Sequence, residues 1–317
     1  MKKIIVLGAG GFIGSHLVKR LKQEGHYVIG ADLKYPEFLA SVSDAFFLGD
    51  LRDIQFVEKV ISENCDELYQ LAADMGGAGY IFTGEHDADV MHNSAQINLN
   101  VAKIATKKQV KALFYSSSAC IYPEYNQLEP NNPKCNEDSV YPAQPDSEYG
   151  WEKLFSERLY FSFLRNYGLN VKVARFHNIY GEACAWESGR EKAPAALCRK
   201  IATSNDDTIE VWGDGLQTRS FLHIDDCLDA VQMFMQSDFH GPYNIGSEEI
   251  ISINDFVALI AEIAGKKIHI HHIDGPQGVR GRSSDNRKIE TDLHWKPQYD
   301  LRTGMTKLYA WINEQVK

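Results

Sequence analysis

The chain has 317 residues, of which 44% are hydrophobic and 24% charged, a composition typical of a folded globular protein. Its formal net charge is −10 and its basic residues are scattered, which argues against a nucleic-acid partner. No apolar run approaches the roughly 18 residues needed to cross a bilayer, so we expect no membrane partner. The six cysteines form no CxxC pair, which predicts free thiols in a cytoplasmic protein and no metal site.

Short apolar runs alternate with helical patterns through the first 175 residues. The expected strands are 4–7, 27–31, 67–72, 112–116 and 171–175, and the expected helices are 15–24, 54–62, 94–107 and 149–166. This alternation predicts an α/β fold of the Rossmann type, a doubly wound parallel sheet with helices on both faces. Beyond residue 176 the alternation weakens and loops lengthen, which indicates a smaller mixed α/β cap that binds substrate.

These patterns divide the chain into two domains. Residues 1–175 plus 221–246 are expected to form an NAD-binding Rossmann domain, because 244–246 resembles a late strand that returns to the main sheet. Residues 176–220 plus 247–317 are expected to form the cap.

A glycine-rich turn joins the first strand to the first helix. Gly8, Gly11 and Gly14 have the spacing GxxGxxG, and Phe12 and Ile13 lie between them. Glycine lets the backbone approach a pyrophosphate at a helix N-terminus, where free N–H groups favour anions. A glycine turn without a ligand is the alternative, but the flanking strand and helix favour dinucleotide binding.

Other strand ends complete the expected cofactor site. Asp32 ends the second strand, where a carboxylate can bind a ribose diol and would repel a 2′-phosphate, so it favours NAD over NADP. Asp50 and Leu51 follow the third strand and could lie at the adenine, although a solvated loop fits them nearly as well. Leu71 and Ala73 end the fourth strand, where small residues let a cofactor lie close.

Ser118, Tyr149 and Lys153 suggest hydride chemistry on a hydroxyl group. Tyr149 and Lys153 are four residues apart and share one helix face. A lysine ammonium and a nicotinamide cation would both favour the phenolate, and Ser118 can bind the substrate hydroxyl. Tyr149 and Lys153 are therefore expected to contact the cofactor as well. A surface Tyr/Lys pair is the alternative for this spacing taken alone.

Together these motifs resemble the extended short-chain dehydrogenase/reductase family over essentially the whole chain. That resemblance implies oxidation or reduction of a sugar hydroxyl, usually on a nucleotide sugar. More specific segments are similar to those of GDP-mannose 3,5-epimerases, which implies a GDP-hexose substrate, tightly bound and recycled NAD, and a homodimer formed by the helices at 94–107 and 149–166. These segments are 73–77, 117–123, 175–181, 189–196, 212–221 and 278–282.

The resemblance implies that Cys120 and Lys192 are an acid/base pair that inverts C5, C3 or both after transient oxidation of C4. Nearby positive charge can lower the pKa of a thiol toward neutral pH. Cys120 follows Ser118 by two residues and should face the same cavity if the segment is extended. Arg190, beside Lys192 in the sequence, would lower the pKa of its amine. The alternatives are a buried structural cysteine and a phosphate-binding lysine.

The residues expected to bind substrate lie mostly in the cap. Arg219 and Arg280 could neutralise the diphosphate through bidentate contacts, with Arg282 as a weaker candidate and surface ion pairs as the alternative. The full set is Gly76, Gly77, Asn178, Glu191, Lys192, Lys200, Trp212, Gln217, Arg219 and Arg280.

Two segments, 81–91 and 182–188, depart from the pattern of that enzyme group and leave the exact sugar open. A 4-epimerase or 4,6-dehydratase of the same family is one alternative. A 4-epimerase does not need Cys120 and Lys192, and a dehydratase expects an acidic pair after the serine. A non-catalytic NAD-binding regulator is the alternative from another class, but it would not need Ser118, Tyr149 and Lys153.

Overall fold

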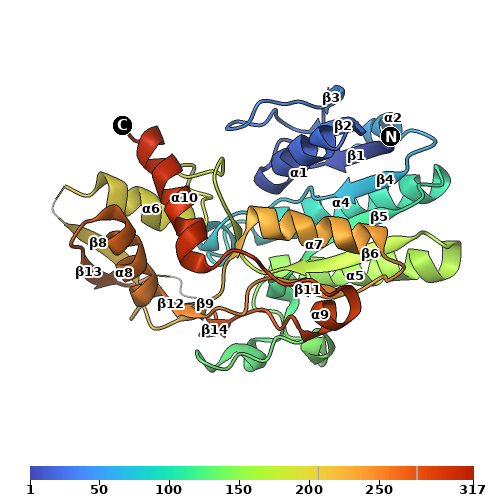
Figure 1. Cartoon of the computed structure of the whole chain (residues 1–317). Coiled ribbons are helices and arrows are strands. Elements are labelled where there is room, and N and C mark those ends of the chain that lie inside the picture. Colours follow the sequence, from blue (N-terminus) through green and yellow to red (C-terminus); the bar gives the residue numbers. More distant parts are fainter. Residues whose placement is uncertain (206, 276–277) are drawn as a thin grey trace.

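The computed structural model describes residues 1–205, 207–275 and 278–317. Its main feature is a parallel sheet of seven strands in the order β11-β6-β5-β4-β1-β2-β3 (Figure 1). Every pair of neighbouring strands runs parallel, which confirms the predicted doubly wound sheet. The strands are β1 (Lys3–Leu7), β2 (Tyr27–Asp32), β3 (Ala45–Leu48), β4 (Glu67–Gln70), β5 (Leu113–Ser118), β6 (Val171–Phe176) and β11 (Tyr243–Ile245).

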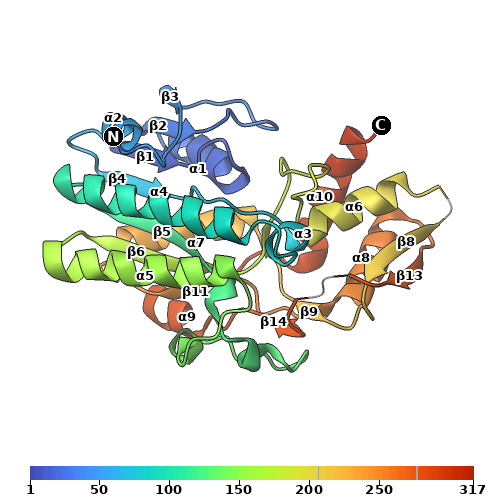
Figure 2. The same ribbon diagram turned by 180° about the vertical axis from the view of Figure 1, so that it is seen from behind.

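Helices cover both faces of this sheet (Figures 1 and 2). One face carries α2 (Ile54–Val60), α4 (Asp87–Lys107) and α5 (Glu148–Tyr167), and the other carries α1 (Phe12–Gln23), α7 (Ile224–Gln236) and α9 (Arg287–Leu293). Successive residues of a strand point to opposite faces. Ile4 and Val6 of β1 therefore pack in the core under α1 and α7, whereas Ile5 and Leu7 pack under α4.

The cap lies beside the carboxyl ends of the sheet strands and has a core of its own. Its helices are α6 (Ala193–Thr203), α8 (Ile253–Ala264) and α10 (Leu301–Gln315), and Phe221 stacks on Phe256 inside this core. Its strands are short: β8 (Thr208–Trp212) pairs with β13 (His269–Ile273), β12 (Ile251–Ser252) and β14 (Gly281–Arg282) flank β9 (Thr218–Arg219), and β7 (Ile179–Tyr180) pairs with β10 (Leu222–His223).

Several boundaries differ from the sequence expectations. Helix α4 begins at Asp87 rather than at 94, because Asp87 and Asp89 supply negative charge to its first turn, where it stabilises a helix N-terminus. Helix α9 packs on β11 of the main sheet, although its residues fall in the range expected for the cap. The division into domains at the predicted residues stays a prediction.

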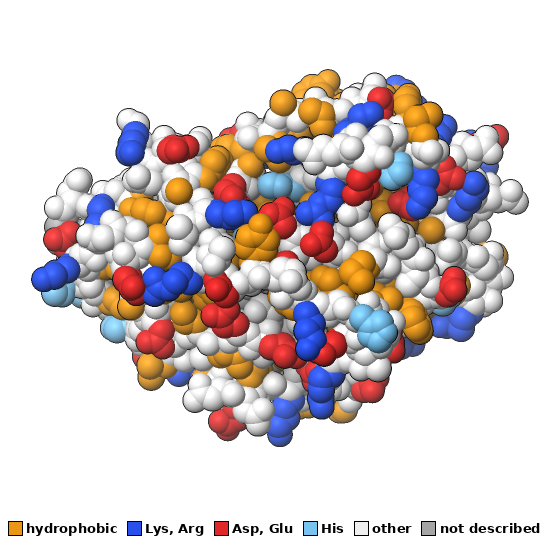
Figure 3. Space-filling model, in the orientation of Figure 1, with side chains coloured by type: hydrophobic (Ala, Val, Ile, Leu, Met, Phe, Trp, Pro, Cys, Tyr) orange, Lys and Arg blue, Asp and Glu red, His pale blue; other side chains and the backbone are white. Residues whose placement is uncertain are grey.

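Three short 3-10 helices and one short α-helix lie between the larger elements. They are η1 (Ala119–Ile121), η2 (Glu124–Gln127), η3 (Glu137–Val140) and α3 (Ala78–Ile81). In the described part of the chain, no helix is both long and apolar enough to cross a membrane. On the face drawn in Figure 3, acidic and basic side chains are interspersed over both halves of the molecule.

Candidate active site

The glycine turn after β1 forms a cradle that side chains would fill. Gly8 has φ +84°, and a Cβ there would lie 2.8 Å from the backbone nitrogen of Ala72, just beyond β4. A Cβ on Gly14 would lie 2.0 Å from the carbonyl oxygen of Gly8. Gly11 is the N-cap of α1, and no side chain of the described residues caps this end, so its first N–H groups can bind a phosphate. The cradle sits where the strand order reverses between β1 and β4, the place where such folds bind dinucleotides.

Asp32 lies against this turn at the end of β2. Its Oδ2 accepts a hydrogen bond of 2.9 Å from the Gly10 N–H. Burial raises the pKa of the Asp32 carboxyl, whereas backbone hydrogen bonds and the charge of Lys34 oppose the rise. A carboxylate held at the rim of the cradle fits the ribose of NAD.

The remaining predicted cofactor contacts lie at carboxyl ends of neighbouring strands. Leu71 follows β4 and donates its N–H to the Leu7 carbonyl at 3.1 Å. Leu51 is buried, whereas Asp50 is half-exposed and forms an ion pair of 2.6 Å with Arg52. Phe12 and Ile13 form the first turn of α1, and Ala73 follows β4. Their roles as cofactor contacts remain predictions.

Tyr149 and Lys153 lie on α5 and face β5. Both side chains are buried, and the Lys153 Nζ lies 5.6 Å from the centroid of the Tyr149 ring. The ammonium also donates a hydrogen bond of 2.9 Å to the Ser116 carbonyl, which fixes it under the strand. Burial lowers the pKa of Lys153, and the charge of Glu152 opposes that shift.

The pKa of Tyr149 in the protein alone is set mainly by burial. Burial raises the pKa of the phenol, the charges of Cys120 and Glu152 add to the rise, and a hydrogen bond with Ser118 opposes it. The expectation that Lys153 and a nicotinamide cation together favour the phenolate concerns the cofactor-bound enzyme and stays a prediction.

Cys120 lies in the same cluster as Tyr149, but its backbone differs from the sequence expectation. Residues 119–121 form η1 instead of continuing the strand, and the Cys120 N–H donates to Ser118 Oγ at 3.2 Å. The expectation of an extended segment is wrong, because the Ser118 side chain caps this turn. Cys120 nevertheless packs in one cluster with Tyr149. Gly150 allows this approach, since a Cβ there would lie 2.2 Å from the Cys120 carbonyl oxygen.

Arg282, expected from the sequence only as a weaker candidate for binding the diphosphate, is the hydrogen-bond partner of the thiol. This buried arginine lies on β14, and its Nη1 donates to Cys120 Sγ at 3.2 Å. Its Nη2 forms an ion pair of 2.7 Å with Asp146, and its Nε donates to Gln127 Oε1 at 2.5 Å. The Arg-Gly-Arg sequence at 280–282 is visible in the chain, but nothing in it indicates which arginine contacts the cysteine in the folded protein.

Lys192 is the N-cap residue of α6 and approaches the same centre from the cap. Burial lowers the pKa of its amine, and the charge of Cys120 opposes the shift. The lowered pKa was expected, but its cause is burial rather than the neighbouring Arg190. Glu191, the preceding residue, accepts a hydrogen bond of 3.0 Å from Arg199 through Oε1, whereas its Oε2 is buried without a hydrogen-bond partner among the described residues.

Gly76, Gly77, Asn178 and Arg219 lie around this centre. A Cβ on Gly77 would lie 2.3 Å from the Glu191 carbonyl oxygen, so only glycine lets the two loops touch. Asn178 has φ +45° and donates to the Ser220 carbonyl at 2.9 Å. Burial, together with the charge of Arg282, lowers the pKa of Arg219 to about 10.

The other predicted substrate residues lie farther out on the cap. Arg280 forms a partly exposed ion pair of 3.0 Å with Asp214, and Lys200 donates to the Glu210 carbonyl at 2.8 Å. Trp212 is 39% exposed, and its ring lies 3.6 Å from the position of a Cβ on Gly79 in α3. Gln217 is buried and donates to the Trp212 carbonyl. Substrate contact by these residues stays a prediction.

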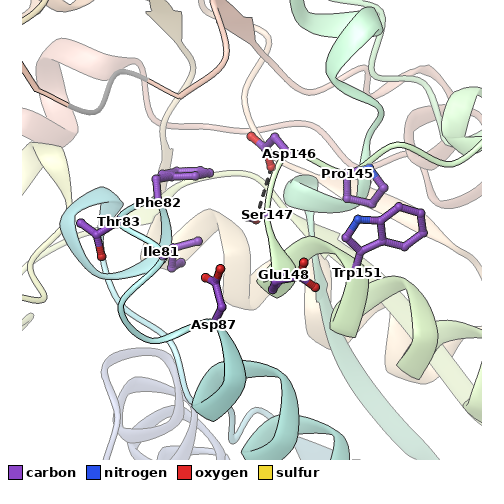
Figure 4. A pocket seen from close by; sticks show the side chains of 10 residues that line it. Ile81, Phe82, Thr83, Asp87, Pro145, Asp146, Ser147, Glu148 and Trp151 are labelled. Carbon is purple, nitrogen blue, oxygen red and sulfur yellow. Dashed lines mark hydrogen bonds between the residues drawn. The ribbon is translucent and has the colours of Figure 1, made fainter.

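A pocket of about 420 Å³ opens beside this centre (Figure 4). Asp146, the ion-pair partner of Arg282, forms part of its wall and also accepts a hydrogen bond from Ser147 at 3.4 Å. The pocket is lined by Ile81, Phe82, Thr83, Gly84 and Asp87 from one segment and by Pro145, Asp146, Ser147, Glu148 and Trp151 from another. Segment 81–91, whose sequence differs from the pattern of the enzyme group that the chain resembles, therefore lies next to the site.

Comparison with known proteins identifies the family. The model of the NAD dependent epimerase/dehydratase family matches residues 4–246. The chain belongs to this family. It is 47% identical over 317 residues to GDP-mannose 3,5-epimerase from Arabidopsis thaliana, covering 99% of this chain and 83% of the relative. It is 46% identical to GDP-mannose 3,5-epimerase 1 from Oryza sativa subsp. japonica, covering 99% and 82%.

Solved structures support the fold. UDP-glucose 4-epimerase from Thermotoga maritima, solved with UDP-glucose, superimposes with a TM-score of 0.89 at 24% identity and covers 99% of this chain and 100% of that one. MoeE5, solved with UDP-glucuronic acid and NAD, gives a TM-score of 0.83 at 24% identity, with 99% of each chain covered. The predicted family, Rossmann-type fold and NAD cofactor are confirmed, and this family member is an NAD-dependent enzyme of the epimerase class.

Proposed function

We propose that this enzyme is a GDP-mannose 3,5-epimerase, which converts GDP-mannose to GDP-L-galactose, GDP-L-gulose or both. The observation that supports this proposal most strongly is the Cys120 thiol, which lies 3.2 Å from Arg282 and packs with Tyr149. A dehydrogenase site already has its proton acceptor in Tyr149. The additional thiol and the Lys192 amine serve a reaction that needs two further proton transfers.

The first step activates the sugar ring. NAD held at the glycine cradle would supply hydride transfer at C4, taking the hydride and giving it back to the same carbon, so the reaction would have no net redox change. Tyr149 takes the proton of the C4 hydroxyl, Ser118 binds that hydroxyl, and Lys153 holds the charge of the phenolate. The ring now carries a ketone at C4.

The ketone makes the neighbouring C–H groups acidic, because the electron pair left after proton loss is shared with the carbonyl oxygen. One of the pair Cys120 and Lys192 removes the proton from C5 or C3, and the other donates a proton to the opposite face of that carbon. The configuration is thereby inverted. Arg282 donates a hydrogen bond of 3.2 Å to Cys120 Sγ and so holds the sulfur in place. Tyr149 finally returns its proton to the C4 oxygen.

Buried positive charge suits a nucleotide diphosphate. Arg219 lies next to Arg282 in a buried position, where an anionic group would relieve the repulsion between the two cations. The rest of the GDP-sugar is proposed to be bound by Asn178, Glu191, Lys200, Trp212 and Gln217, together with Arg280 at the rim. Gly76 and Gly77 leave room for the sugar beside α3.

We also propose that the enzyme is a cytoplasmic homodimer. Large apolar side chains are exposed on α4 and α5, which lie side by side (Figure 2), and four of them would form the proposed contact. They are Met91, Leu99, Trp151 and Phe155, which are 36%, 42%, 39% and 45% exposed. A second copy of the same helix pair would bury them in a four-helix contact. All six cysteines are free, as is usual in a reducing compartment.

A product assay tests the proposed substrate. Purified enzyme is incubated with GDP-mannose, and separately with UDP-glucose and UDP-glucuronic acid, and the sugars are followed by NMR. We expect GDP-L-galactose or GDP-L-gulose from GDP-mannose and no 4-epimer from the UDP-sugars. Turnover of a UDP-sugar with none of GDP-mannose would favour a 4-epimerase, and loss of water to a 4-keto-6-deoxy sugar would favour a dehydratase.

A further inference from the structure

A stack of three side chains joins the Lys192 segment to the dinucleotide-binding half of the molecule. Arg190 precedes Lys192 by two residues, and its guanidinium carbon lies 3.9 Å from the centroid of the Tyr80 ring in α3. The Tyr80 ring stacks on His86, just before α4, with 4.2 Å between the ring centroids and 22° between the planes. A guanidinium at this distance from a ring is attracted by the ring quadrupole.

Asp74 fixes this stack from the side. Its Oδ1 accepts a hydrogen bond of 3.0 Å from the Tyr80 hydroxyl and lies 3.6 Å from Arg190 Nη1. Asp74 is itself held by α4, because Asn93 donates to its Oδ2 at 2.8 Å and the Asp74 N–H donates to Ser94 Oγ at 3.0 Å. The stack is therefore anchored to a long helix of the main sheet.

Backbone contacts also hold the segment that contains Arg190 and Glu191 against Gly77. The Gly77 N–H donates to the Arg190 carbonyl at 3.0 Å, and the Gly77 α-carbon lies directly against the Glu191 carbonyl. Arg190 and Glu191 thus touch the main sheet domain immediately before the chain reaches Lys192 and enters α6. Movement of Arg190 would move the backbone that carries the Lys192 amine.

We propose that Arg190, with Tyr80 and His86, is a positioning residue that sets where Lys192 meets the sugar ring. This role rests on the proposed function, because it assigns Lys192 to proton exchange. Arg190 acts through the backbone and the ring stack and does not itself transfer a proton. Its loss should therefore slow proton exchange at C5 and C3 while C4 oxidation, which depends on α5 and β5, continues.

The alternative is a solvated arginine without consequence for the reaction. The Arg190 side chain is 53% exposed, so its ion pair with Asp74 is screened by solvent. Arg302 offers a matched control, because it is also 53% exposed and forms an ion pair of 2.7 Å with Glu262, which joins α10 to α8 within the cap. The same substitution at both positions separates loss of any exposed arginine from loss of the stack.

The test measures two rates in Arg190→Met, Arg190→Lys, Tyr80→Phe and Arg302→Met. With saturating GDP-mannose in deuterated water, deuterium at C5 and C3 is followed by NMR, and C4 oxidation is followed in a single turnover by the absorbance of reduced nicotinamide. We expect Arg190→Met to lose about tenfold in deuterium incorporation and less than about twofold in C4 oxidation. Arg190→Lys keeps the charge but not the planar group, so its rate of deuterium incorporation should lie between those of the wild type and Arg190→Met. Tyr80→Phe keeps the ring, so its rate should fall less than that of Arg190→Met.

Arg302→Met is expected to match the wild type in both rates. Undiminished deuterium incorporation in Arg190→Met, or an equal fall of both of its rates, would overturn the positioning role. Wild-type enzyme that oxidises C4 but incorporates no deuterium would instead contradict the proposed 3,5-epimerisation, and the role of Arg190 would fall with it.

Discussion

The sulfur of Cys120 lies 3.2 Å from Arg282, a residue 162 positions away in the chain. The guanidinium donates a hydrogen bond to the sulfur and fixes its position. Arg282 is in turn held by Asp146, so a buried ion pair fixes the cation beside the thiol. Lys192 completes the centre from the cap, where burial makes its neutral amine accessible.

The lowered pKa of Lys192 leads to a pH prediction. Raising the pH converts the ammonium to the amine, so base catalysis by Lys192 should increase with pH through an apparent pKa below the ordinary lysine value of 10.5. We expect the rate of deuterium incorporation into GDP-mannose to follow this profile in wild type. Lys192→Arg should lose the rising limb, because arginine stays protonated.

C4 oxidation separates this effect from that of Lys153, whose pKa is also lowered by burial. The pH profile of single-turnover nicotinamide reduction should be the same in Lys192→Arg as in wild type. A deuterium-incorporation profile that is unchanged by Lys192→Arg would show that another group is the base.

The sequence predicts the residue types of the site better than their geometry. Ser118, Tyr149 and Lys153 follow from a strand end and a helical spacing, and Cys120 from the resemblance. Arg282 could be found only by folding, because its contacts with Cys120, Gln127 and Asp146 span more than 130 positions. The burial of Glu191 Oε2 without a hydrogen-bond partner among the described residues is likewise a property of the folded cap.

At the scale of elements, the main sheet was predictable because its strands are apolar runs separated by long amphipathic helices. The two-residue strands of the cap, such as β9 and β14, are too short for any periodicity and depend on their partners in the folded chain. The 3-10 turn at η1 was also missed, because the Ser118 cap that ends the strand competes locally with an extended backbone.

His177 links the ends of β6 and β11 and makes stability depend on pH. Its Nε2 lies 2.9 Å from Asn244 Oδ1, which also accepts a hydrogen bond from Tyr122, so the ring donates there. Burial lowers the pKa of His177 to about 3 from 6.5. The folded state therefore holds the ring neutral, and its contribution to stability is present above pH 6.5 and is lost as the pH falls toward 3.

From this shift we expect the free energy of unfolding to fall by about 2 kcal/mol between pH 7 and pH 5 through His177 alone. Urea denaturation of the wild type and of His177→Gln, each at pH 7 and at pH 5, measures this change in the free energy of unfolding. The variant, although less stable at pH 7, should lose less stability on acidification. An equal loss in both proteins would contradict the assignment.

At the scale of the whole molecule, the cofactor site and the proposed proton-exchange residues lie at the same edge of the main sheet. The carboxyl ends of the sheet strands carry the cofactor cradle, and the cap lies beside the same edge (Figure 1). Tyr149 comes to this edge from α5, Lys192 from the N-cap of α6 and Arg282 from β14. Helices α4 and α5, which carry large exposed apolar side chains, are proposed to form the dimer contact. Catalytic and proposed dimer surfaces therefore share α5.

The proposed dimer predicts a specific effect of charge on α5. Phe155→Glu would bury a carboxylate in the four-helix contact, so we expect dissociation to monomers at micromolar protein concentration, measured by sedimentation velocity. Phe239→Glu, at a 44% exposed phenylalanine far from α4 and α5, is the control and should stay dimeric. Monomeric wild type, or a dimer that survives Phe155→Glu, would contradict this interface.

The central claim is that Cys120 and Lys192 exchange the protons beside a transient C4 ketone. Incubation of GDP-mannose with the enzyme in deuterated water, followed by NMR of the sugar, tests it most directly. We predict deuterium at C5, at C3 or at both in wild type, and a loss of at least about a hundredfold in incorporation in Cys120→Ala and in Lys192→Ala. Incorporation that persists undiminished in both variants, or no deuterium in wild type, would contradict the account.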